Sequence, residues 1–161
     1  MLKLIGFDAD DTLWHSEVYF RTAHDAFEKI LANYLDLTNI KVHEHLLDVE
    51  RRNIKLFGYG AKGMTLSMLE TAISITNERI SAKHLHEIIG LGKEVLLHPV
   101  SLIDGIEQAV KDIAKEYQVV LITKGDLFHQ ESKVEQSRLS SLFGRIEIKS
   151  KKDSATYQRV L

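Results

Sequence analysis

Three carboxylates follow the first apolar segment of the sequence. Asp8, Asp10 and Asp11 come directly after residues 2–7, in the order Asp-x-Asp-Asp-Thr. Acids at the end of a buried strand are costly to desolvate unless they bind a cation or take part in a reaction. Acids after a strand often only cap the next helix, but this spacing at this place favours a catalytic or metal-binding role for Asp8 and Asp10.

Three segments are predicted to be strands, and polar residues follow each of them. Residues 2–7 and 118–123 are apolar through their centres, which is typical of strands buried on both faces of a parallel sheet. Residues 145–149 alternate polar and apolar side chains, which indicates an edge strand. Helical patterns separate the strands, so we expect an α/β fold with a parallel sheet whose ligands bind beyond the carboxyl ends of the strands.

A long helical insertion separates the first strand from the rest. Apolar residues recur at intervals of three and four over residues 17–98, and a glycine-rich loop at 57–63 divides two of the expected helices. The lone proline, Pro99, follows the last of them. We therefore expect a core domain of residues 1–14 and 100–161 and an all-helical domain of residues 15–99.

Polar side chains also end the second and third predicted strands. Thr123 and Lys124 follow the second strand, and Lys151 and Lys152 follow the third. Ligands of parallel sheets bind beyond the carboxyl ends of the strands, so polar residues at these positions could line such a site. Each signal is weak alone, since threonine is common in strands and a lysine pair is usually solvated.

The order of these groups resembles the haloacid dehalogenase-like (HAD) superfamily, whose first motif is Asp-x-Asp-x-Thr. The resemblance implies a Rossmann-like core of about three strands with an inserted helical cap. It further implies that Asp8 is a nucleophile, that Asp10 is a general acid and base, and that Mg²⁺ is bound by the Asp8 carboxylate and the Asp10 backbone carbonyl. Thr12 in the family helps to fix the turn at the substrate site.

The resemblance also assigns the remaining site residues. Thr123 matches the motif-two hydroxyl that binds a phosphoryl oxygen, and Lys124 beside it is a candidate substrate contact. Lys152 is the preferred motif-three lysine, with Lys151 as the alternative and Lys133 as a further candidate. In members with a helical cap a loop of the cap selects the substrate, which implies that role for Tyr59 and Lys62.

The implied function is Mg²⁺-dependent hydrolysis of a small phosphate ester through an aspartyl-phosphate. Family members that displace halide lack the second acid, so Asp10 favours phosphate, with a haloacid dehalogenase as the alternative within the family. A different alternative is a catalytically impaired fragment that serves as a protein-interaction module. A phosphoaspartate receiver is disfavoured, because receivers are phosphorylated after a later strand.

The family's fourth motif supplies further acids to the metal after a fourth strand, and no counterpart follows Lys152 in this sequence. Its absence is expected to weaken Mg²⁺ binding. The fourth strand lies beside the first in the family, so residues 2–7 are expected to form an exposed edge. Such an edge favours a homodimer or strand exchange. A further 60–80 residues, roughly, would complete the sheet.

Composition and charge limit the kinds of chemistry, partner and cellular compartment that the sequence favours. The chain has 161 residues, no cysteine and a formal net charge of −2. This excludes disulfides and thiolate chemistry and gives no basic surface for nucleic acid or an anionic membrane. No apolar run is long enough for a membrane span or a signal segment. We expect a cytoplasmic protein whose partner is a small phosphorylated metabolite.

Overall fold

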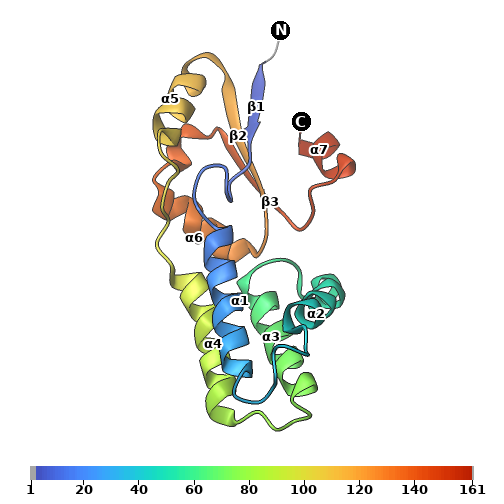
Figure 1. Ribbon diagram of the computed structural model, residues 1–161. Coiled ribbons are helices and arrows are strands. Elements are labelled where there is room, and N and C mark those ends of the chain that lie inside the picture. Colours follow the sequence, from blue (N-terminus) through green and yellow to red (C-terminus); the bar gives the residue numbers. More distant parts are fainter. Residues whose placement is uncertain (1–2, 161) are drawn as a thin grey trace. The chain divides into compact units, whose positions relative to one another are not determined.

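The computed structural model describes residues 3–160 (Figure 1). None of the described helices is long and apolar enough to cross a membrane. The elements occur in the order β1 (Leu4–Phe7), α1 (Glu17–Leu31), α2 (Val42–Phe57), α3 (Ala61–Ile75), α4 (Ala82–Leu97), α5 (Ile106–Glu116), β2 (Gln118–Lys124), α6 (Leu127–Ser137), a 3₁₀ turn (Ser140–Leu142), β3 (Arg145–Lys149) and α7 (Ser154–Val160).

The three strands form one parallel sheet in the order β1-β2-β3. Phe7 lies opposite Leu121 in the register of β1 and β2, and Thr123 lies opposite Ile148 in that of β2 and β3. The predicted α/β class is confirmed, as is the edge position of residues 145–149. The carboxyl ends of all three strands therefore lie at one edge of the sheet.

The burial predicted for the first strand was wrong. None of the four residues of β1 is fully buried, and Gly6 is exposed, whereas Val119 to Thr123 of β2 are all buried. The reason is topological, because β1 pairs only with β2 among the described strands and its other edge is open. Leu2 of the predicted segment lies outside the described residues. The expected pairing of this edge with a second chain stays a prediction.

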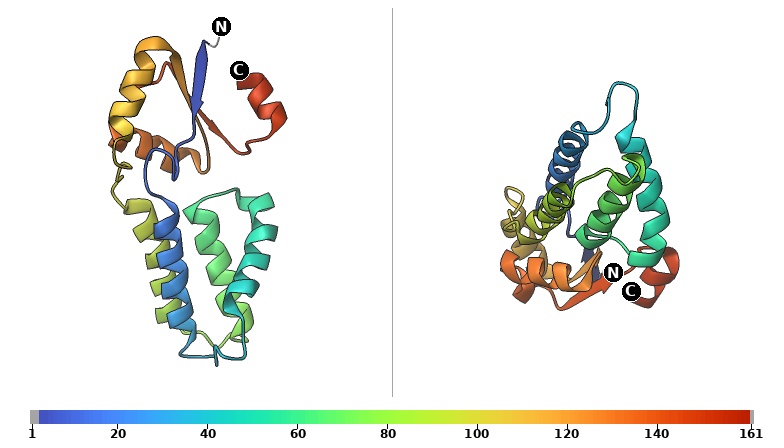
Figure 2. Two further views of the ribbon diagram at one scale, coloured as in Figure 1. Left: turned by 45° about the horizontal axis from the view of Figure 1, so that its top comes forward. Right: turned by 90° about the horizontal axis from the view of Figure 1, so that it is seen from below.

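Two apolar clusters cover the two faces of the sheet. Alternate residues of β2 point to opposite faces, so Val119 and Leu121 belong to the larger cluster and Val120 and Ile122 to the smaller. The larger cluster includes Val110 of α5 together with side chains of α6 and the 3₁₀ turn. In Figure 2, α5 and α7 lie on opposite sides of the sheet.

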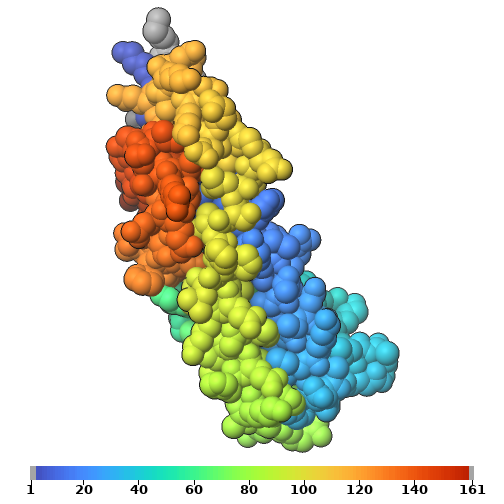
Figure 3. Space-filling view, turned by 90° about the vertical axis from the view of Figure 1, so that its left-hand side faces the viewer, coloured from blue at the N-terminus to red at the C-terminus, as the bar shows by residue number. Residues whose placement is uncertain are grey.

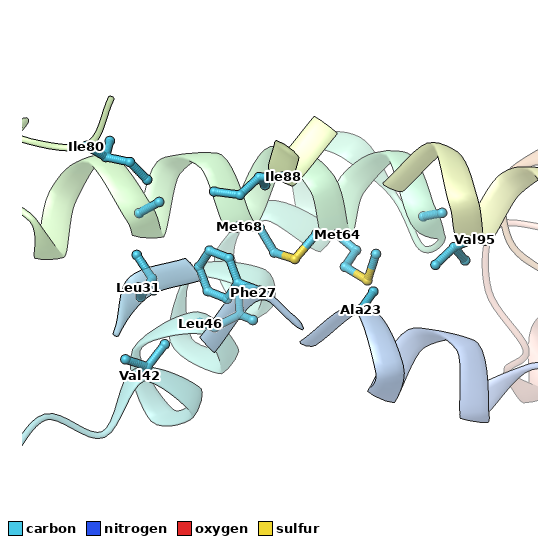
Figure 4. Close-up of a cluster of buried hydrophobic side chains, with 12 residues drawn as sticks. Ala23, Phe27, Leu31, Val42, Leu46, Met64, Met68, Ile80, Ile88 and Val95 are labelled. Atoms are coloured by element: carbon cyan, nitrogen blue, oxygen red, sulfur yellow. The ribbon is translucent and has the colours of Figure 1, made fainter. Parts of the chain in front are cut away.

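Helices α1–α4 form a second core of their own. Phe27 and Leu31 of α1 are fully buried against Met68 of α3 and Ile88 of α4 (Figure 4). Their spacing of three and four residues is what the sequence pattern requires of helices with one buried face. Figure 3 shows α1 and α4 side by side at the surface of this bundle.

The chain divides into two compact units. One spans Val18–His98, and the other comprises the described residues up to Glu17 and from Pro99 onward. The two connecting segments run antiparallel within the second of these units. The His15 N–H donates to the Ser101 carbonyl at 3.0 Å, and the Ile103 N–H donates to the Leu13 carbonyl at 3.0 Å. The chain therefore leaves and re-enters the sheet unit at adjacent points.

Candidate active site

A tight loop after β1 presents the first acids. Ala9, Leu13 and Trp14 are at most 1% exposed and anchor the loop in the core of the sheet unit. The Ala9 carbonyl accepts the Thr12 and Leu13 N–H groups at 3.1 and 2.7 Å. These anchors leave Asp8 exposed and Asp10 half-buried at the carboxyl edge of the sheet.

Asp8 is paired with one of the two candidate lysines. Lys152 Nζ donates to Asp8 Oδ1, which also accepts the Ala9 N–H at 2.7 Å. Lys151 is exposed. Both hydrogen bonds that the described residues make to the Asp8 carboxyl are to Oδ1, so Oδ2 remains available for chemistry.

Asp10 is held by three donors. Lys133 Nζ lies 2.5 Å from Asp10 Oδ1, Trp14 Nε1 donates to the same oxygen at 2.8 Å, and Gln130 Nε2 donates to Oδ2 at 2.8 Å. Burial raises the pKa of the Asp10 carboxyl, but the Lys133 charge and the three hydrogen bonds outweigh it and hold the pKa below its usual 3.8. Asp10 is therefore a carboxylate at neutral pH.

Gln130 also connects the two motifs. Its Nε2 donates to the Lys124 carbonyl at 2.8 Å as well as to Asp10, so one amide group links the loop after β1 to the loop after β2. Gln130 and Lys133 are buried residues of α6 that are 3% and 7% exposed. Helix α6 therefore supports the site through side chains one turn apart.

Asp11 has a structural role instead. Its carboxylate accepts the N–H groups of Ser16 and Glu17 at 3.0 Å each, where α1 begins. Its φ of 57° is in the left-handed region, which aspartate tolerates better than most residues. Asp11 thus joins the acidic loop to the start of the first helix.

Five further residues were predicted to contact the substrate, and they belong to both units of the chain. Thr123 is 1% exposed at the end of β2, and Thr12 and Lys124 are exposed on the loops after β1 and β2. Tyr59 and Lys62 belong to the helical unit, just before α3 and in its first turn. The contacts predicted between these five residues and a substrate stay predictions.

The oxygens present fit Mg²⁺ as a partial ligand set. Among residues 3–160 no group of three or more acidic, histidine or cysteine side chains converges as a metal site. Mg²⁺ is commonly bound by one or two carboxylates, with water and substrate phosphate completing its shell. The Asp8 carboxylate and the Asp10 carbonyl are ligands of that kind. The Asp10 side chain is engaged by its three donors, so only its backbone suits the metal.

One supporting residue escaped the sequence analysis, and another was given a different role. Gln130 was not selected, and Lys133 was named only as a further candidate for the motif-three lysine, whereas both contact Asp10. A signal was present in α6, where four of the five buried positions carry polar side chains: His129, Gln130, Lys133 and Ser137. Polar residues on the buried stripe of a helix must find partners inside the protein.

Comparisons with known proteins bear on the family and the fold. The model of the haloacid dehalogenase-like hydrolases matches residues 2–160. A search of curated proteins gives no match. Among solved structures, a haloacid dehalogenase-like family hydrolase from Xanthomonas campestris is 60% identical to this chain, with a TM-score of 0.93. That likeness covers 99% of this chain and 66% of the relative.

Two more distant structures share the fold. A 2-haloacid dehalogenase from Pseudomonas syringae pv. Tomato DC3000 is 21% identical with a TM-score of 0.54, covering 92% of this chain and 64% of that one. A predicted phosphoglycolate phosphatase from Haemophilus somnus 129pt is 15% identical with a TM-score of 0.57, covering 99% and 70%. The chain thus spans about two thirds of the length of these proteins. By its family match and its 60% identical relative, the chain belongs to the haloacid dehalogenase-like hydrolases.

Proposed function

We propose that this hydrolase cleaves small phosphate esters through a covalent intermediate on Asp8. The supporting observation is that a second acid, Asp10, stands two residues from the nucleophile and is held as a carboxylate by Lys133, Gln130 and Trp14. Hydrolysis of a phosphate ester moves a proton twice, and a positioned carboxyl group suits that task. A halide leaving group needs no proton, so displacement of halide gives Asp10 no comparable catalytic role.

The reaction has two balanced steps. Asp10 is a carboxylate at rest, so the reaction proceeds from the minor form of the enzyme in which Asp10 carries a proton. In that form Asp8 Oδ2 attacks phosphorus and forms an acyl-phosphate bond, while the ester P–O bond breaks and the leaving oxygen takes the proton from the Asp10 carboxyl group. Water then attacks phosphorus and gives a proton to the Asp10 carboxylate, and Asp8 leaves as a carboxylate. Asp10 thus returns to its starting protonation state, and the products are an alcohol and inorganic phosphate.

The charges near Asp8 favour an anionic substrate. Lys152 holds Asp8 Oδ1 and offsets negative charge where a phosphoryl group would approach. The Asp8 carboxylate and the Asp10 carbonyl would hold Mg²⁺, which screens the repulsion between a carboxylate and a phosphate dianion when it is bound. Thr123 and Lys124, at the end of β2, complete the proposed phosphate contacts.

The test is the hydrolysis of p-nitrophenyl phosphate with Mg²⁺ or with EDTA. We expect Mg²⁺-dependent turnover that Asp8→Asn reduces at least about 10³-fold, because an amide is a poor nucleophile. Asp11→Asn is the matched control, since Asp11 is in the same loop but caps α1, and an asparagine oxygen can still accept the same N–H groups. Its activity should stay close to that of the wild type.

Halide release from 2-chloropropionate separates the phosphatase from a dehalogenase. Asp8-dependent release of chloride with no phosphate release would replace the proposal by the dehalogenase alternative. Equal phosphatase activity in the wild type and Asp8→Asn would contradict a role for Asp8 in either reaction. Far-UV circular dichroism on all three proteins ensures that only folded variants are compared.

A further inference from the structure

The Asp10 carboxylate has one acceptor position left. An ionised carboxylate offers about four lone-pair positions. Lys133 and Trp14 occupy the two on Oδ1, and Gln130 occupies one on Oδ2. No other described residue donates to this carboxylate. A group that exchanges a proton with Asp10 must therefore approach Oδ2.

The orientation of the Gln130 amide is fixed by what it faces. Its Nε2 lies 2.8 Å from both Asp10 Oδ2 and the Lys124 carbonyl oxygen, and both of these atoms only accept hydrogen bonds. The reversed amide would place oxygen against two oxygens. The NH₂ group therefore faces the site, and both of its protons are used in joining the two loops.

Gln130 is a costly residue for stability alone. It is 3% exposed, and its Oε1 has no hydrogen-bond partner among the described residues. A buried carbonyl without a partner destabilises the folded state. A leucine of similar size would avoid that cost, so the value of the glutamine lies in what its NH₂ group holds.

The neighbouring backbone leaves room for this amide. A Cβ on Gly125 would lie 2.8 Å from Gln130 Nε2. The φ of Gly125 is 144°, a backbone conformation that residues other than glycine rarely adopt. Glycine at this position therefore lets the amide approach the Lys124 carbonyl and Asp10 together. The loop after β2 and the residue on α6 are matched to one another.

We propose that Gln130 and Lys133 are positioning residues that, together with Trp14, clamp Asp10 so that Oδ2 alone exchanges protons with the leaving oxygen and with water. We call these three residues the Asp10 clamp. The proton-exchange part of this inference rests on the proposed phosphatase function, whereas the clamp itself does not. Neither Gln130 nor Lys133 needs to touch the substrate for this role.

The first readout is independent of activity. Trp14 is the only tryptophan, so its indole N–H gives a single cross-peak in a ¹⁵N–¹H spectrum. Because this N–H donates to Asp10 Oδ1, a displaced carboxylate should move the cross-peak upfield. We expect that shift in Gln130→Leu and in Lys133→Met. Gln136→Leu, an exposed substitution on the same helix, should leave the peak in place.

The second readout is the dependence on the leaving group. Phenolate is a poorer leaving group than p-nitrophenolate and needs the proton from Asp10 more. In Gln130→Leu we expect kcat for phenyl phosphate to fall at least about tenfold more than kcat for p-nitrophenyl phosphate, with little change in KM. A merely structural loss would lower both rates by the same factor, as would a smaller fraction of folded protein.

The outcomes separate the two proposals. An unmoved indole peak in folded Gln130→Leu, or equal losses for the two esters, overturns the positioning role. If the wild type hydrolyses neither ester, the proposed function fails, and the clamp is judged by the indole peak alone. If Gln130→Leu does not fold, Gly125→Ala takes its place, because the added methyl group displaces the same amide.

Discussion

Lys152 and Asp8 are 144 residues apart in the sequence, and Lys152 Nζ donates a hydrogen bond to Asp8 Oδ1. The two residues follow the outer strands of the sheet, β1 and β3, with β2 between them. The lysine occupies only one carboxylate oxygen. The pair therefore fixes the orientation of Asp8 without closing Oδ2 to a substrate.

Lys152→Ala and Lys151→Ala should differ strongly in activity although they change adjacent residues. Loss of Lys152 frees Asp8 and removes a cation beside the phosphoryl site, so we expect kcat/KM for p-nitrophenyl phosphate to fall about 10²–10³-fold. Lys151 is exposed, and its loss should change kcat/KM less than about twofold. A reversed order of the two variants would transfer the motif-three role to Lys151.

The ion pair of Lys133 and Asp10 should stabilise the folded protein, because each charge offsets the cost of burying the other. The Lys133 side chain is 9% exposed and that of Asp10 is 29% exposed. Breaking a fully buried pair costs about 3–5 kcal/mol, so for this partly solvated pair we expect Lys133→Met to lower the free energy of unfolding by about 2 kcal/mol. Urea unfolding in EDTA measures this free energy without a metal contribution.

A double-mutant cycle provides the control for that prediction. Asp10→Asn leaves the buried Lys133 without its counter-charge and should also destabilise the protein. The combined variant removes both charges, so its loss should be clearly smaller than the sum of the two single losses. Strict additivity would show that the two side chains do not stabilise one another.

Two glycines of α4 should respond oppositely to alanine. A Cβ on Gly92 would collide with the Thr65 side chain of α3, whereas one on Gly90 meets no atom within 4 Å. We expect Gly92→Ala to destabilise the protein by about 1–3 kcal/mol and Gly90→Ala to stabilise it by about 0.5–1 kcal/mol. Thermal unfolding of both variants tests the difference, and Thr65→Ala should partly rescue Gly92→Ala.

Asp11 should matter for folding and not for turnover. Asp11→Ala removes the acceptor at the start of α1 and keeps a side chain in the left-handed region, so the loss should be about 1–2 kcal/mol. Asp11→Gly also loses the acceptor but relieves the backbone, and it should be less destabilising than alanine. Urea unfolding measures both variants. A greater loss for glycine would show that backbone strain at Asp11 is negligible.

Local patterns were sufficient to predict the strands and the residues that follow them. The apolar run of residues 118–123 identified β2 and placed Thr123 at its end, and the alternation of residues 145–149 identified an edge strand. Burial of β1 was not predictable from its composition, because Ile5 and Phe7 would be equally apolar in a central strand. The open edge of β1 was expected only from the resemblance to the family, and the order of the described strands has β1 at the edge.

The partners of the acids depended on the tertiary structure. Lys151 and Lys152 are adjacent and chemically identical, and the direction in which the chain leaves β3 determines which one reaches Asp8. Gln130 and Lys133 are more than 100 residues from Asp10, and only the packing of α6 beside the sheet brings them to it. Polar side chains at most of the buried positions of α6 were the detectable trace of that packing.

The antiparallel contacts of Leu13 with Ile103 and of His15 with Ser101 have a consequence for how the molecule is assembled. In the topology of the sheet unit, the bundle of α1–α4 occupies the position of a hairpin loop. The chain segments before and after the bundle are joined by neighbouring antiparallel hydrogen bonds. Sequences of very different length can occupy such a position without moving the acids on the neighbouring loop. The helical unit is in this sense an insertion that could be replaced by another, because residues of the sheet unit alone position Asp8 and Asp10.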